Sequence, residues 1–259
     1  MNFITTAKPI GYIGKNYKQP ARLLSAGSSN AKTAKNSIKT FILYIAPSTL
    51  NYAGRNLCAW ANQCANVCLY EAGRGKFTNV QNARINKANY FVEDRRTFVQ
   101  QLAGEIIKET EKAKRNGEKI AFRLNGTSDI DFIFYLEKYA GLNVETLAPT
   151  AIFYDYTKGI KRALRYKAHP NYIVTFSRAE NNHVETLTAL KAGLNISAVF
   201  DTPKGQPLPE TFHGYKVLDG DASDIVMLYN RGAVLGLRAK GDAKKDNSGF
   251  VIKTAQILN

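Results

Sequence analysis

The chain of 259 residues is long enough for one large α/β domain or two small domains, and its 44% hydrophobic and 22% charged residues are typical of a folded protein. Its formal net charge is +15, and residues 1–70 carry eight lysines and arginines but no aspartate or glutamate. Such an excess either attracts a polyanion such as nucleic acid or only keeps the protein soluble. No segment has the roughly 18 uninterrupted apolar residues of a membrane span, and the first residues lack the apolar core of a signal peptide. We therefore expect a cytoplasmic protein without a membrane partner.

The first 37 residues differ from the rest of the chain. They are rich in Gly, Ser, Asn and Lys and show no sustained hydrophobic period, which predicts a basic N-terminal arm (1–37) docked on the core. Residues 38–259 are predicted to form a single α/β domain with irregular closing strands at its C-terminal end.

Within that domain, predicted strands alternate with predicted helices. An apolar run at 40–46, stopped by Pro47, predicts a strand buried on both faces. Apolar residues at steps of three or four over 80–115 predict a helix that is broken once near Asp94. The alternation continues with strands at 120–125, 151–156, 171–177 and 196–201 and helices at 132–140, 159–167 and 184–192. One or two closing strands are expected from the segments 215–221, 225–230 and 233–241.

This order predicts parallel strands joined by helical crossovers. The fold class is therefore α/β, as a doubly wound sheet or a barrel, and we favour a TIM-like or partial (β/α) barrel with the cysteine loop after its first strand. Ligands bind at the C-terminal edge of such sheets, so the polar residues that follow the strands are the candidate cofactor or substrate contacts. These residues are Asn125, Thr127, Ser128, Asp129, Asp155, Lys158, Ser177 and Arg178.

Three cysteines, Cys58, Cys64 and Cys68, are spaced as C-x5-C-x3-C in one loop, and the chain has no other. An odd, clustered set in a cytoplasmic protein argues against disulfides and favours a metal site. Zinc would need a fourth ligand from a histidine more than a hundred residues away. A [4Fe-4S] cluster held by three thiolates would leave its fourth iron for water, a side chain or a small molecule. The histidines are His169, His183 and His213.

Cations and glycines surround the thiols in sequence. Arg55, Arg74 and Lys76 could stabilise thiolates and an anionic cluster, and Gly73 and Gly75 allow a close backbone approach. The same AGRGKF segment also fits a phosphate-binding turn, although it lacks the Walker spacing.

The position of the cysteine loop resembles that of radical S-adenosylmethionine enzymes. In those enzymes three cysteines after the first barrel strand hold a [4Fe-4S] cluster, and the cofactor chelates the fourth iron. The LNGTSD turn at 124–129 lies where they contact the cofactor. Their usual spacing is C-x3-C-x2-C, so the likeness is one of plan and not of membership.

Over most of its length the chain resembles a family of tailed-phage proteins called gene product 88. The motifs LSAGSSNAKTAK, CLYEAGRGKFTNVQNARINK, FRLNGTSDI, TFSRAENN and VLDGDASD carry this resemblance, in this order. It implies a viral protein in the cytoplasm of an infected bacterium, with the three cysteines as iron-sulfur ligands. It implies no particular reaction.

Three functions follow as hypotheses. The first is an iron-sulfur protein with redox or radical chemistry and a small-molecule ligand at the cluster. The alternative is a nucleic-acid-binding phage protein in which a cluster or a zinc ion is structural. The third is a magnesium-dependent hydrolase that uses Asp129, Asp155, Asp201 or Asp221.

Overall fold

The computed structural model describes residues 15–27, 38–66, 68, 70, 73–228 and 230–256. Of the predicted N-terminal arm, residues 1–14 and 28–37 therefore lie outside the described part, and the domain boundary at residue 38 stays a prediction. No helix among the described residues combines the length and the apolar character needed to cross a bilayer.

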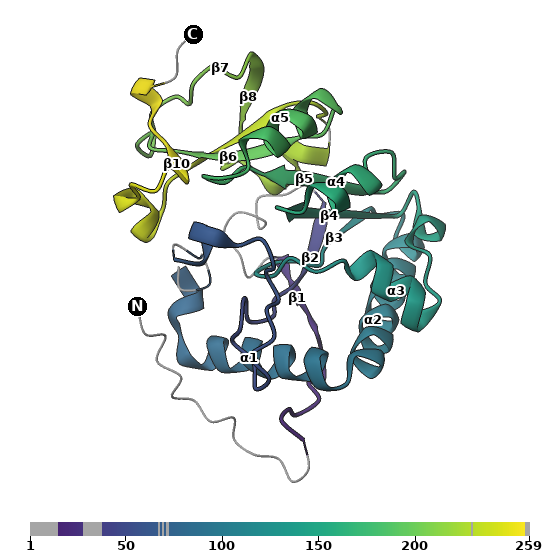
Figure 1. The fold of residues 1–259 in the computed structure, drawn as a ribbon. Helices are drawn as coiled ribbons and strands as arrows, with labels where there is room; N and C mark the ends of the chain where they lie inside the picture. Colours follow the sequence, from purple (N-terminus) through teal and green to yellow (C-terminus); the bar gives the residue numbers. More distant parts are fainter. Residues whose placement is uncertain are drawn as a thin grey trace.

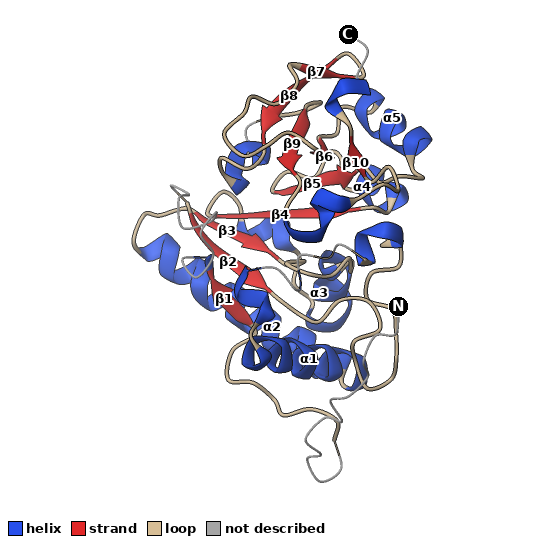
Figure 2. Cartoon of the chain, turned by 90° about the vertical axis from the view of Figure 1, so that its left-hand side faces the viewer, coloured by secondary structure: helices blue, strands red, loops and turns tan. Residues whose placement is uncertain are grey.

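Ten strands form one mixed sheet (Figures 1 and 2). They are β1 (Leu24–Ala26), β2 (Lys39–Leu43), β3 (Ile120–Arg123), β4 (Ala151–Thr157), β5 (Tyr172–Ser177), β6 (Ile196–Phe200), β7 (Thr211–Phe212), β8 (Tyr215–Asp219), β9 (Val234–Arg238) and β10 (Val251–Ile252). The order across the sheet is β1-β2-β3-β4-β5-β6-β9-β8-β7, and β10 also pairs with β6. Only the β1–β2 and β7–β8 pairs are antiparallel among the described strands.

The connections between the strands carry α-helices and short 3₁₀ turns. The α-helices are α1 (Thr78–Glu93), α2 (Arg95–Arg115), α3 (Phe132–Ala140), α4 (Ile160–Arg165) and α5 (His183–Lys191). The 3₁₀ helices are η3 (Asn62–Ala65), η5 (Gly73–Lys76), η6 (Val144–Leu147), η7 (Asp224–Leu228), η8 (Gly241–Lys245) and η9 (Thr254–Gln256).

The sheet is buried on both faces, as the apolar strands predict. Neighbouring strand residues alternate between two cores, with Phe122 and Phe153 in the larger one and Ala121 and Tyr154 on the opposite face. The larger core also takes in the apolar sides of α1, α2 and α3, which lie together on one side of the sheet (Figure 2). Met227 of η7 covers the other face. Both faces must be covered in this way because parallel strands have no polar side to present to water.

The TIM-like barrel favoured above is not confirmed, because the described strands form an open sheet. Each edge ends in a short antiparallel strand, β1 on β2 at one side and β7 on β8 at the other. Among the described strands β1 and β7 do not pair with each other, so the sheet does not close, and each short strand protects one edge. The coarser prediction, a mixed α/β fold with a mostly parallel sheet, is confirmed.

The sheet splays between β5 and β6. These strands pair only at Phe176 with Ile196 and at Ser177 with Ser197. Beyond this point β10 takes the place of β5 and pairs in parallel with Val199 and Phe200 of β6. A segment from the C-terminal end of the described chain thus completes the C-terminal edge of the central strands.

Several predicted elements are confirmed with their boundaries. The long helix breaks at Asp94, whose carboxylate accepts a hydrogen bond from the Thr97 amide at 3.3 Å and so caps α2. Helix α3 covers the predicted 132–140 and ends at Gly141 in the left-handed conformation, with φ 64°. The segment 225–230 is not a strand, since η7 occupies most of it. One helical turn directs Met227 and its neighbours to a single core, whereas a strand would divide them between two faces.

The aromatic packing under the sheet predicts a large effect of truncating Phe98. Its ring is fully buried and lies edge-on to Tyr90 and Phe91, with ring centroids 5.1 and 5.3 Å away. The substitution Phe98→Ala should lower the free energy of unfolding by about 3–5 kcal/mol in a urea titration. Val184→Ala, at a residue of α5 that is 72% exposed, should change it by less than about 0.5 kcal/mol. Similar effects of the two substitutions would contradict this packing.

Candidate functional site

The cysteine loop, residues 44–77 between β2 and α1, crosses the C-terminal edge of the sheet. The Cys58 thiol lies 3.7 Å from the carbonyl oxygen of Thr127, in the loop after β3. The indole of Trp60 packs on Gly159 after β4, where a Cβ atom would come within 2.9 Å of the ring. The backbone amide of Gln63 donates a hydrogen bond of 3.3 Å to the carboxylate of Glu180, which follows β5. Three strand-end loops and the cysteine loop therefore meet at one edge.

The three thiols occupy different surroundings along this loop. Cys64 packs in a small apolar cluster with Ala179 and Phe250, and Cys68 accepts a hydrogen bond of 3.4 Å from the Tyr70 amide. The described residues contain no group of three His, Cys, Asp or Glu side chains arranged to hold a metal ion. The donor chemistry nevertheless suits a soft metal or an iron-sulfur cluster, because all three donors are sulfur. Sharing one metal group would require the sulfur atoms to move closer together.

The thiols influence one another through charge. Burial is the main cause that raises the pKa of Cys58 to about 12; the charges of Cys68, Asp129 and Cys64 act in the same direction, and a backbone hydrogen bond at Ser48 opposes them. Cys58 is therefore a protonated thiol at neutral pH. A bound cation would relieve both the desolvation and the mutual repulsion of the thiolates.

Sequence reasoning missed Arg84 of α1, which lies beside Cys68. Its guanidinium carbon is 4.7 Å from the ring centroid of Tyr44 and 5.5 Å from that of Tyr70. Its Nη1 atom is buried and has no hydrogen-bond partner among the described residues. Burial lowers the pKa of Arg84, whereas Tyr44, Tyr70 and Cys68 raise it. Arg84 is the seventh residue of the helix that follows the loop, and this position was the signal in the sequence that could have identified it. The cations that were predicted from the loop itself, Arg55, Arg74 and Lys76, are all exposed.

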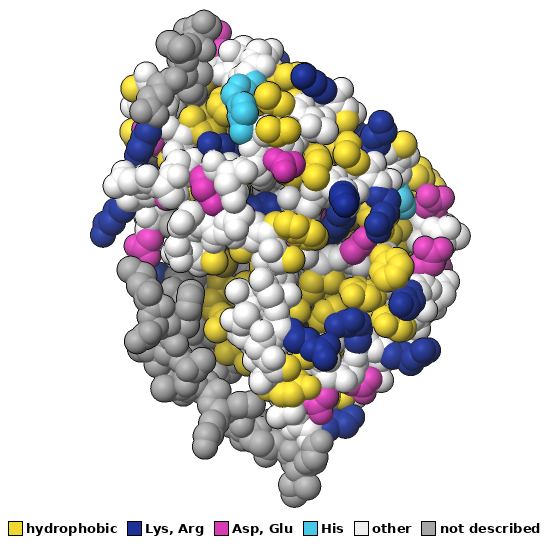
Figure 3. Space-filling model, viewed as in Figure 1, with side chains coloured by type: hydrophobic (Ala, Val, Ile, Leu, Met, Phe, Trp, Pro, Cys, Tyr) yellow, Lys and Arg dark blue, Asp and Glu magenta, His cyan; other side chains and the backbone are white. Residues whose placement is uncertain are grey.

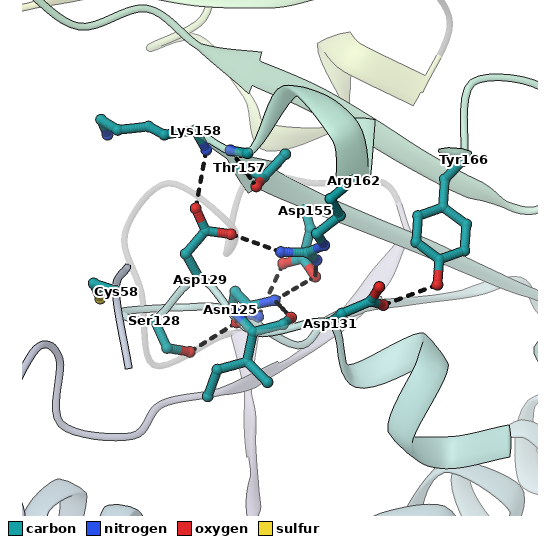
Figure 4. A network of polar contacts seen from close by, with 12 residues as sticks. Cys58, Asn125, Ser128, Asp129, Asp131, Asp155, Thr157, Lys158, Arg162 and Tyr166 are labelled. Carbon is teal, nitrogen blue, oxygen red and sulfur yellow. Dashed lines mark hydrogen bonds and ion pairs between the residues drawn. The ribbon is translucent and has the colours of Figure 1, made fainter. Parts of the chain in front are cut away.

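A buried polar network lies beside Cys58, which is drawn at its left in Figure 4. The backbone amide and the side-chain amide of Asn125 donate hydrogen bonds of 2.9 and 2.8 Å to the two oxygens of Asp155. The Asn125 side chain also closes its own turn, because its Oδ1 atom accepts hydrogen bonds of 2.8 Å from the Ser128 hydroxyl and the Ile130 amide. Asn125 therefore fixes the loop after β3 onto β4.

Arg162 of α4 neutralises two carboxylates in this network. Its guanidinium lies 2.7 Å from an oxygen of Asp129 and 3.2 Å from an oxygen of Asp155, and it also donates a hydrogen bond to the Tyr172 hydroxyl. Burial raises the pKa of Asp155 to about 6, and Arg162 and Asn125 act in the opposite direction. The second oxygen of Asp129 accepts a hydrogen bond of 2.9 Å from the Lys158 amide. Both carboxylates are thus committed to internal partners.

This geometry disfavours the predicted magnesium site. Asp129 and Asp155 share the charge of Arg162, and the other two aspartates have partners of their own. Asp201 accepts hydrogen bonds from the amide and hydroxyl of Thr254 at 2.9 and 2.8 Å. Asp221 pairs with Lys240 and Arg238. Asp129 and Asp155 meet at Arg162, whereas Asp201 and Asp221 are held by other residues, so the four aspartates do not converge on one metal site.

The remaining predicted site residues lie at two places on the sheet edge, with Thr127 and Lys158 near Cys58 and with Ser177 and Arg178 at the end of β5. The Thr127 hydroxyl donates a hydrogen bond of 2.6 Å to the Ile45 carbonyl, which ties the loop after β3 to the chain after β2. The Lys158 side chain points away from Arg162 (Figure 4), and its ammonium lies 5.8 Å from the ring centroid of Phe250. Ser177 and Arg178 lie farther along the edge, at β5. The Ser177 hydroxyl accepts a hydrogen bond from Ser197, and Arg178 donates to the carbonyls of Gly249 and Phe250 just before β10.

The histidines are partnered away from the thiols. His169 pairs with Glu145 at 3.6 Å. His183 on α5 lies edge-on to His213 in the β7–β8 turn, with ring centroids 5.0 Å apart. The His183–His213 contact was not predicted, because thirty residues separate the two histidines in the sequence. A shallow pocket of about 520 Å³ lies beside β7 and β8, lined by Leu208, Val217 and Arg238 among others, and none of the predicted site residues lines it.

A family model described as Gene product 88 matches residues 21–254 of the chain. No curated protein and no solved structure matches it significantly.

The buried charges predict a strong dependence on Arg162. The substitution Arg162→Ala leaves the buried Asp155 and the partly buried Asp129 without their cation and should lower the free energy of unfolding by about 3–5 kcal/mol in a urea titration. Arg165→Ala is the matched control on the same helix, because its side chain is 60% exposed and pairs with Asp131 at 3.2 Å. It should cost less than about 1 kcal/mol. Equal losses would show that the network around Arg162 does not hold the loop.

The single tryptophan reports how the cysteine loop docks. Gly159 has φ −84°, so alanine fits its backbone, and the substitution Gly159→Ala acts only by pushing the Trp60 ring away. We expect the Trp60 fluorescence to shift to longer wavelength as the ring becomes more exposed to water. Gly104→Ala, where an added Cβ meets nothing within 4 Å, should leave the emission unchanged. An unchanged spectrum for Gly159→Ala would place the ring elsewhere.

Proposed function

Because the chain belongs to the Gene product 88 family, we propose that it is a phage-encoded iron-sulfur protein acting in the infected bacterial cell. In this proposal Cys58, Cys64 and Cys68 hold a [4Fe-4S] cluster, and the fourth iron is left for a small molecule or a non-cysteine ligand. A cluster bound in this way would supply one-electron chemistry, either as a redox centre or with S-adenosylmethionine in a radical reaction.

The observation that carries the proposal is the position of the thiols. All the cysteines of the chain lie on the loop that crosses the C-terminal sheet edge, where ligands of open α/β sheets bind. Cys58 is electrostatically coupled to the other two thiols, and its raised pKa reflects burial of a group that would be stabilised by a cation. Such a loop releases protons and tightens when a metal binds, which supports a site that assembles with its metal.

Residues around the loop have roles that fit this proposal. Arg84 brings an unpaired, buried N–H group beside Cys68 and would offset the negative charge of thiolates. The Trp60 ring packs on Gly159 and covers the turn after β4, with 46% of the residue exposed. The Asn125 and Arg162 network holds the Thr127 carbonyl against Cys58, so this part of the site floor is fixed before any metal arrives.

The test is anaerobic reconstitution with iron and sulfide. We expect about four irons and four sulfides per chain, with a broad absorption near roughly 400 nm. Cys58→Ala, Cys64→Ala and Cys68→Ala should each remove most of this absorption. Asn66→Ala is the matched control, because Asn66 is exposed on the same loop and its side chain donates only to Gln63.

Two results would contradict the proposal. One zinc and no iron per purified chain would make the cysteines a structural zinc site. Full iron loading of the cysteine variants would place the cluster outside the loop. Addition of S-adenosylmethionine separates the remaining forms, because a changed EPR spectrum of the reduced cluster supports an open fourth iron and an unchanged one supports a redox centre alone.

A further inference from the structure

Aromatic rings and cations gather on one face of the protein, on helices that follow the cysteine loop in the chain. Figure 3 shows hydrophobic and basic side chains side by side over the region where Figure 1 places α3. We call this surface the aromatic–basic face. It consists of Arg95 and Arg96 from the start of α2 and Phe134, Tyr135, Lys138 and Tyr139 from α3.

The rings of this face form a connected set. Tyr135 and Tyr139 stack with an interplanar angle of 9° and centroids 5.7 Å apart, one helical turn from each other. Phe134 lies edge-on to Tyr135 at 5.4 Å and is 43% exposed. Exposure of so large an apolar ring, next to two partly exposed tyrosines, presents aromatic surface to solvent.

Each cation of this face lies against at least one of these rings, and among the described residues none of the three pairs with a carboxylate. The Lys138 ammonium is 5.4 Å from the Phe134 centroid and 5.5 Å from that of Tyr139, and the Arg96 guanidinium is 5.5 Å from Tyr139. Among the ion pairs of the described residues, none involves Arg95, Arg96 or Lys138. Contact with a ring orients a cation without neutralising it.

The acidic groups next to these residues in α2 and α3 leave this positive charge largely intact. Asp94, directly before α2, caps the helix at Thr97 and lies 3.8 Å from the Lys15 ammonium. Asp131 lies at the N-terminal end of α3, but its carboxylate already pairs with Arg165 and accepts a hydrogen bond of 2.9 Å from the Tyr166 hydroxyl. Glu137 is exposed on α3 and is outnumbered by the three unpaired cations. The face therefore keeps a net positive charge within a protein of net charge +15.

We propose that the aromatic–basic face binds single-stranded nucleic acid, with unpaired bases stacking on the exposed Phe134 ring and phosphates contacting Arg96 and Lys138. Stacking on exposed rings and charge attraction to phosphates are the two interactions by which proteins hold single strands without reading their sequence. Rings that protrude from a helix cannot enter an intact base stack, so a duplex satisfies only the charge. The strand is therefore preferred over the duplex. This inference does not depend on the metal content of the cysteine loop.

The test is fluorescence anisotropy with a labelled single-stranded dT oligonucleotide and the matching single-stranded RNA, using the full-length protein. We expect affinity to fall with salt, at a slope of about −0.7 for each phosphate contact. Phe134→Ala and Phe134→Leu should each weaken binding about five-fold or more through lost stacking. Lys138→Ala should weaken it and reduce the salt slope by about 0.7.

Matched controls separate this face from other basic and aromatic surface. Phe77→Ala removes a ring that is 58% exposed next to α1, and Lys112→Ala removes an exposed cation from the far end of α2. Both substitutions should leave the affinity within about two-fold of that of the unmodified protein, because neither changes the proposed face. Absence of binding at low salt would overturn the proposal. So would equal affinity for duplex and single strand, or unchanged affinity in the Phe134 variants, which would assign binding to the basic N-terminal region.

Discussion

Two carboxylates, Asp129 and Asp155, share one guanidinium inside the protein, and the arrangement of the sheet edge depends on that shared charge. A buried carboxylate without a partner is costly, so Arg162 fixes where both aspartates must lie. Asp155 belongs to β4 and Asp129 to the loop after β3, and Arg162 comes from the helix that follows β4. The ion pairs therefore join β4, the loop after β3 and helix α4 at the C-terminal edge of the sheet.

The cysteine loop rests on this fixed base. The Asp129 amide donates to the carbonyl of Leu57 at 3.0 Å, and the next residue, Cys58, faces the Thr127 carbonyl. Farther along, the loop is held by weaker contacts, such as the Gln63 amide on Glu180. The Cys58 end of the loop is thus tied to the buried network, whereas Cys64 packs against an apolar cluster near β10 and Cys68 packs against the main core.

The sequence predicted much of the fold because its local signals agree with the tertiary structure. The alternating apolar runs, the Asp94 cap and the left-handed Gly141 each specify an element without help from distant residues. β1, β7 and β10 were missed because they are two or three residues long and exist only through pairing with distant strands. Among the site residues, the strand-end rule placed Asn125, Asp129 and Asp155 together. It could not reveal Arg162, Arg84 or the His183 and His213 pair, since these meet through packing of helices and turns with no fixed sequence spacing.

The pairing of β10 with β6 has a consequence for the order of assembly. Strands β2 to β6 and their helices can pair while the chain is still being synthesised, because each unit lies next to its predecessor in sequence and in space. The part of the edge beside β5 cannot, since Arg178 donates to the carbonyls of Gly249 and Phe250, and Cys64 packs against an apolar cluster that includes Phe250 and Val251. The surroundings of the middle cysteine are therefore incomplete in a nascent chain until residues 249–252 leave the ribosome. The cysteine loop thus reaches its final packing only after almost the whole chain has been synthesised.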